Sequence, residues 1–293
     1  IIPTIISLKK KFVIISNSFT DINHMNDFPV VYKSKKKWVA RLINPTESTF
    51  TGYFPEIHLA NFLNAQYGPD KSGTIYGLDA HSGDYNSYFE FYSKIVQKDS
   101  IDMIITIDGG SDSIMRGDEY QIATVYEDWL SLVIIYDLET KYKSKILYGD
   151  LLTVGVGVDR FHGASDASSL RAVAEITRMG GFLGNCSIMP GSEGLQMYSD
   201  FIQYHNSKSA ASSIIQAMVL ASAVGQYGPG LVKEIKPVER ELSWLPKSSI
   251  ELLDLTDDGK NFSSCGNSRA SLSTTYIWPI MSNIYGFKIQ TLV

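Results

Sequence analysis

Short apolar runs alternate with longer amphipathic stretches through most of the chain. The short runs are rich in β-branched residues, end in polar or glycine residues and have the length of strands. They are Phe12 to Ser16, Thr74 to Leu78, Ile101 to Ile107, Leu151 to Val158 and Phe182 to Met189. The run Met103–Ile107 is nearly continuous rather than alternating, which is typical of a strand covered on both faces. We therefore predict buried strands that are mostly parallel.

Helical patterns lie between these strands. Pro55 suits the first turn of a helix whose apolar face begins at Ile57. Further helices are predicted at about 192–205 and 209–224. Several helical stretches follow a residue that can cap them, namely Asp84, Thr124, and Ser165 or Asp166. The alternation predicts an α/β fold: a three-layer, Rossmann-like, mostly parallel sheet with helices on both faces.

The pattern changes after Gly228–Gly230. The tail has strand-like runs separated by Ser, Asn and Gly, at Ile250 to Leu255, Tyr276 to Ile280 and Phe287 to Leu292. We predict one α/β domain over 1–293. In it, 1–228 form the parallel βαβ core, and 229–293 add an edge or an appendage.

Composition and charge restrict the partners. The net charge is −5, whereas nucleic-acid binding needs a clustered basic face, so we predict no nucleic-acid partner. We interpret the lysine cluster within Lys33–Lys37 as a solvated loop. No run approaches the ~18 apolar residues of a membrane-spanning helix, so no membrane partner is expected. The two cysteines, Cys186 and Cys265, do not make a disulfide framework, and this predicts a reducing, cytoplasmic location.

A ligand site is predicted at the carboxyl ends of the strands. In an open parallel sheet, ligands bind there because loops and helix N-termini converge. Polar segments follow the predicted strands at Asn17–Asp21, Asp79–Asp84, Asp108–Asp112 and Asp159–Gly163. If the strands are parallel, these segments share one rim, where a small-molecule ligand would bind.

The densest polar segment runs from Ile107 to Glu119. Gly109 and Gly110 allow a sharp turn whose amides, with Ser111, can bind an anion. Carboxylates follow closely, with a single arginine among them: Asp108, Asp112, Arg116, Asp118 and Glu119.

These carboxylates have more than one interpretation. Asp108 and Asp112 can hold Mg²⁺ through one or two oxygens plus waters, so the cofactor stays open with Mg²⁺ as the candidate. Alternatively, one carboxyl with a raised pKa acts as a general acid or base. A structural interpretation also exists, because Asp and Gly are ordinary turn residues, and Asp118 or Glu119 can simply pair with Arg116.

The histidines and the first cysteine are ambiguous by themselves. His162 follows Asp159 in a glycine loop, where it either transfers a proton and contacts the ligand or is a surface residue. His81 has the same two interpretations. The remaining histidines, His24, His58 and His205, are interpreted as surface or core positions. Cys186 lies in an apolar strand and is interpreted as a buried, inert thiol.

The segment Ile101–Glu119 resembles the family called "domain of unknown function eleven fifty-two". Further segments in matching order and spacing are Ala123–Asp128, Gly155–Gly163 and Gly180–Gly184, so the resemblance covers roughly 50–205. The chain departs from the family pattern at Ala123–Val125, where Gly-Thr-Pro is usual. It also lacks a glycine-rich strand and turn that the family pattern places before Ile1. The resemblance implies an α/β fold with a shared rim site, and it brings no established reaction.

We hypothesise an enzyme acting on a small polar, phosphorylated or nucleotide-like molecule. Asp108, Asp112 and His162 are the candidate catalytic residues. The candidate ligand-binding residues are Gly109, Gly110, Ser111, Arg116, Asp118, Glu119 and Asp159. One alternative is a non-catalytic ligand-binding or sensor module with the same pocket. Another is a structural subunit of a larger assembly, with the aromatic tail Trp244–Phe287 as an interface, and a homo-oligomer stays open.

Overall fold

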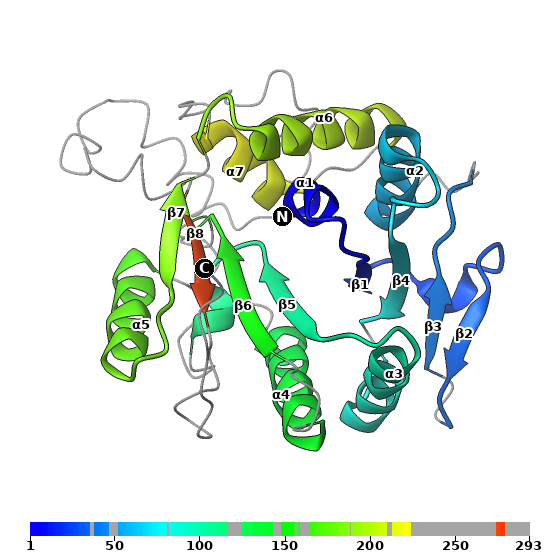
Figure 1. The fold of residues 1–293 in the computed structure, drawn as a ribbon, viewed down its shortest axis with the longest axis horizontal. Helices are drawn as coiled ribbons and strands as arrows, with labels where there is room; N and C mark the ends of the chain where they lie inside the picture. The colour runs from blue at the N-terminus through cyan, green and yellow to red at the C-terminus, as the bar shows by residue number, and fades with distance from the viewer. Residues whose placement is uncertain are drawn as a thin grey trace, which may run out of the picture. The chain divides into compact units, whose positions relative to one another are not determined.

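The computed structural model describes residues 1–35, 38–46, 52–80, 82–115, 125–142, 148–155, 158, 165–187, 189–209, 213–223 and 274–278. Within them the chain forms two compact units (Figure 1). The first contains Ile1–Phe91 and Gly191–Ser213, and the second contains Tyr92–Pro190, Ile214–Ala223 and Thr274–Trp278. Each unit has its own sheet.

The sheet of the first unit has the strand order β1-β4-β3-β2. These strands are β1 (Val13–Ser18), β4 (Thr74–Asp79), β3 (Val39–Leu42) and β2 (Val30–Lys33). β1 and β4 are parallel, with Ser18 opposite Asp79, so both strands present their carboxyl ends at the same edge. The other two pairings are antiparallel.

Three helices lie wholly within the described part of the first unit: α1 (Ile2–Ser7), α2 (Pro55–Tyr67) and α6 (Glu193–Lys208). A 3-10 turn, η1 (Ile22–His24), follows β1. The core gathers apolar side chains from η1, β3, α2 and β4, with Met197 of α6 among them. Helices α2 and α6 contact each other, as Figure 1 shows, and α1 also contacts α6.

Helix α3 (Tyr85–Lys98) begins in the first unit and ends in the second. Its predicted cap is confirmed, because the backbone N–H of Ser87 donates to Asp84 Oδ1 at 2.8 Å. Pro55 occupies the first turn of α2, as its fixed φ favours.

The sheet of the second unit has the order β5-β6-β8-β7. Its strands are β5 (Met103–Asp108), β6 (Tyr148–Val154), β8 (Thr274–Trp278) and β7 (Gly184–Ser187). β5 and β6 are parallel, whereas β8 is antiparallel to both β6 and β7. The described part of the tail run predicted at 276–280 therefore lies in an interior strand of this sheet, β8, rather than at an edge.

The helices of the second unit are α4 (Val125–Lys141), α5 (Asp166–Arg178) and α7 (Ile214–Ala223), with a 3-10 turn η2 (Asp112–Ile114). α4 connects β5 to β6 and packs against both strands. The predicted cap of α5 is confirmed: Ser165 Oγ accepts from the N–H of Ser168 at 3.2 Å. Among the described residues, no helix combines the length and apolar character needed to cross a membrane.

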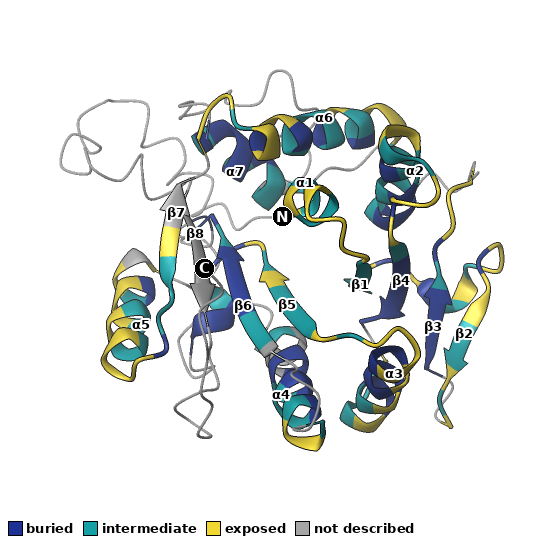
Figure 2. Cartoon of the chain, in the orientation of Figure 1, coloured by how far each residue is buried: buried dark blue, intermediate teal, exposed yellow. Residues whose placement is uncertain are grey.

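The structure confirms an α/β fold but gives small, mixed sheets. Among the described strands, parallel pairing is limited to β1/β4 and β5/β6, and the other pairings are antiparallel. The prediction that β5 is covered on both faces is also wrong for this structure. Its residues are half-buried or exposed, and Ile107 is 57% exposed, whereas β4 is buried along most of its length (Figure 2). Among the described elements, α4 packs against β5 and β5 is the edge strand of its sheet, and edge strands are less covered than interior ones.

Candidate metal centre at the end of β5

The polar turn after β5 is fixed by its glycines and by a buried serine. Gly110 has φ +153°, a value that side-chain-bearing residues rarely adopt. A Cβ added to Gly109 would lie 3.2 Å from Cγ2 of Ile215, so the backbone passes close to α7. The fully buried Ser111 lies with its Oγ 3.1 Å from Oγ of Ser169 on α5. The turn is thereby anchored to α5.

The 3-10 turn η2 packs on the core of the second unit. Ile114 and Met115 are buried and pack with Leu132 of α4 and Leu151 of β6. Ser113 Oγ donates a hydrogen bond of 2.7 Å to Asp108 Oδ2, which ties η2 back to the end of its own strand. The acidic side chains of this region therefore extend from an anchored backbone.

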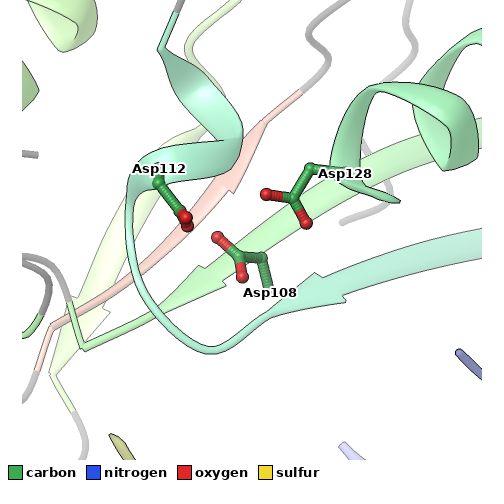
Figure 3. Close-up of side chains that lie close together, drawn as sticks. All are labelled: Asp108, Asp112 and Asp128. Carbon is green, nitrogen blue, oxygen red and sulfur yellow. The ribbon is translucent and has the colours of Figure 1, made fainter. Parts of the chain in front are cut away.

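Three carboxylates converge above this backbone: Asp108 at the end of β5, Asp112 at the start of η2 and Asp128 in the first turns of α4. One oxygen from each lies within 4.8 Å of the others, and all three residues are half-buried. Figure 3 shows the carboxyl groups turned toward one another from three separate elements. Separate elements bring them together, so the cluster is a product of the fold.

Burial and the neighbouring charge of Asp112 change the pKa of Asp108. Burial raises the pKa of Asp108 to about 6, the negative charge of Asp112 adds to the rise, and the Ser113 hydrogen bond opposes it. Near neutral pH the ionised cluster is therefore under electrostatic repulsion. A bound cation would relieve that repulsion.

The structure describes some of the predicted site residues and not others. Asp108 and Asp112 lie together, and Gly109, Gly110 and Ser111 form the turn between them. Five predicted residues lie outside the described part of the chain: Arg116, Asp118, Glu119, Asp159 and His162. His81 lies outside it as well.

Asp128 was missed by the sequence reasoning. The residue lies in a helical pattern that reads simply as amphipathic, twenty positions after Asp108. The sequence did contain a signal for Asp128. In a βαβ unit, the first turns of the helix lie near the carboxyl end of the strand before it, so an acidic residue in those turns can join an acidic strand end.

The strand ends of the first unit are occupied by structural contacts. Asp79 is 2% exposed, and its Oδ2 accepts hydrogen bonds from Asn23 Nδ2 at 2.7 Å and from Ser82 Oγ. Asp21 is exposed and hydrogen-bonds His24 at 2.6 Å. Since Asp21 and Asp79 belong to the first unit and Asp108 to the second, one rim shared by all the predicted strand ends stays a prediction.

No family model matches the chain, and neither a curated protein nor a solved structure matches it. The family resemblance noted above therefore stays an expectation. The carboxylate cluster is the feature of the chain from which a function can be inferred.

Proposed function

We propose that the chain binds a divalent cation, with Mg²⁺ the best candidate, at Asp108, Asp112 and Asp128, as part of an enzyme for small phosphorylated or otherwise anionic substrates. The convergence of three carboxylates from β5, η2 and α4 carries this proposal. The cation would be held by protein oxygens on one side, and its other positions would be open to water and substrate oxygens.

The donor set fits a hard cation. Mg²⁺ takes oxygen ligands at about 2.0–2.1 Å in octahedral geometry, so its ligand oxygens lie roughly 3–4 Å apart. The oxygens of this cluster lie within 4.8 Å of one another, and small side-chain rotations would close the remaining gap. The cluster offers neither thiolate nor imidazole, the ligands that favour softer metals.

The location also supports the proposal. β5, α4 and β6 form a βαβ unit with a parallel strand pair, the building block of three-layer, Rossmann-like sheets. In such folds ligands bind beyond the carboxyl ends of the strands. The cluster lies at this end of β5, where Asp108 pairs with Thr153 of β6.

Calorimetric titration with MgCl₂ and MnCl₂ tests the cation. We expect Asp108→Asn and Asp128→Asn each to weaken binding at least tenfold, because each variant removes a charged ligand. Asp102→Asn is the matched control, because Asp102 lies one residue before β5, is exposed and is outside the cluster. Equal affinity in the wild type and both cluster variants would remove the metal from the proposal, as would wild-type protein that binds neither ion at millimolar concentration.

A further inference from the structure

A histidine pair in the first unit is independent of the carboxylate cluster. His58 of α2 and His205 of α6 are 147 positions apart in sequence, yet their Nδ1 atoms lie 2.8 Å apart. At this distance one ring donates its Nδ1–H and the other accepts with a lone pair. The hydrogen bond therefore requires that at least one of the two Nδ1 atoms carries no proton.

The rings lie in largely apolar and aromatic surroundings. His205 is 1% exposed, and its ring centroid is 5.7 Å from that of Tyr53 and 6.2 Å from that of Phe201. His58 is half-buried, and its centroid is 6.5 Å from that of Tyr204. These neighbours fix the rings but neutralise no positive charge.

The charged groups that act on His58 have the wrong sign to stabilise its protonated form. Lys208 of α6 acts on His58 as a like charge, and so does a protonated His205. Glu56 of α2 directs its carboxyl elsewhere, accepting from Ser16 Oγ of β1 at 2.8 Å. Helix α1, which also packs on α6, carries no ionisable side chain.

We propose that His58 and His205 form an acid-sensitive latch that holds α6 against α2. When at least one ring is neutral, the Nδ1–Nδ1 hydrogen bond closes the latch. Protonation of both rings removes the acceptor, places two cations side by side next to Lys208, and opens it. α6 belongs to the segment by which the chain returns to the first unit between two stretches of the second.

The direction of the pH effect follows from the environment of the pair. Burial lowers the pKa of His58 from 6.5 to about 4, with smaller contributions from His205 and Lys208. A group whose pKa is depressed in the folded state stabilises that state above its unfolded pKa. This stabilisation is lost as the pH falls through the folded pKa. The latch is therefore fully closed above about pH 6.5 and weakens toward pH 4.

Hydrogen exchange of the whole chain tests the latch. After correction for intrinsic rates, we expect backbone amides of α6 and of the facing part of α2 to exchange roughly tenfold faster near pH 4.5 than near pH 7.5. Amides of β4, in the same unit, report any global loosening and should change much less. Equal acceleration of α6 and β4 would overturn the proposal, since it would show general acid unfolding.

Variants and a direct titration complete the test. His58→Gln keeps a hydrogen-bonding side chain but cannot be protonated, so the acid-induced exchange in α6 should disappear. His24→Gln, at an exposed histidine, should leave it unchanged. If His58→Gln fails to fold, nitrogen-15 NMR of the wild-type imidazoles decides the matter. His58 should stay neutral near pH 5.5, and an ordinary titration between pH 6 and 7 would overturn the latch.

Discussion

Replacing Asp108 with Asn separates the contribution of this side chain to stability from its contribution to metal binding. Asn keeps the shape of the side chain and an oxygen that can accept the hydrogen bond from Ser113 Oγ. The change removes the ionisable group whose pKa is raised from 3.8 to about 6, chiefly by burial and then by Asp112. Because ionisation is disfavoured in the folded state, the wild type loses stability as the pH rises from about 3.8 through about 6.

The size of this loss follows from the pKa difference. A shift of about two units corresponds to roughly 3 kcal/mol, and the half-buried position of Asp108 reduces this to about 1–2 kcal/mol through solvent screening. In the absence of divalent ions, Asp108→Asn should therefore raise the free energy of unfolding of the second unit by about 1–2 kcal/mol near pH 8. Near pH 3.5 the variant and the wild type should have the same stability.

Urea unfolding in EDTA at the two pH values measures this difference, and a parallel series with 10 mM MgCl₂ measures the metal. Mg²⁺ should stabilise the wild type more than the variant, because the stabilisation grows with the ratio of the ligand concentration to its Kd and the variant binds at least tenfold more weakly. A variant that is less stable than the wild type near pH 8 would refute the reasoning. So would a stability gain of the same size at both pH values.

Three further substitutions probe the two units. Burial raises the pKa of Glu56. In urea unfolding, the wild type should therefore lose stability relative to Glu56→Gln above about pH 4.5, and parallel profiles of stability against pH for the two proteins would contradict this. An added Cβ at Gly149 would lie 2.3 Å from Ile135 Cγ2, so Gly149→Ala should cost about 1–3 kcal/mol by thermal unfolding, and less in an Ile135→Ala background. The buried Arg41 donates to three backbone carbonyls at 2.6–2.8 Å, so Arg41→Met should cost at least about 3 kcal/mol in urea, and a neutral result would contradict this.

Local features of the fold were readable from the sequence. The caps at Asp84 and Ser165 and the proline at the start of α2 depend on residues within one helical turn, so spacing alone reveals them. The antiparallel pair of β2 and β3 was missed because its strands are short and the sequence between them is rich in lysine. Strand partners depend on contacts between distant segments. The interior position of β8, between β6 and β7, could not be predicted for that reason.

The local part of the candidate site could likewise be predicted from the sequence. Asp108 and Asp112 lie four positions apart, and a glycine turn after a strand brings such residues close. Asp128 joins them because α4 packs against β5 and η2. This packing cannot be predicted from the sequence near any one of the three residues. The histidine pair was also unreadable, because each residue fits a core or surface position on its own helix. Sequence periodicity indicates which face of an element is buried, and it does not indicate what lies across from that face.

The half-exposed β5 has a consequence for the behaviour of the chain in solution. Among the described strands it is the edge of its sheet, with β6 as its neighbour, and an edge strand can pair with another extended segment through its backbone N–H and C=O groups. The exposed Ile107 adds an apolar side chain on one face of this strand. A concentrated preparation should therefore self-associate through strand addition along β5, directly beside the acidic cluster, and any such association would crowd the approach of small molecules to Asp108.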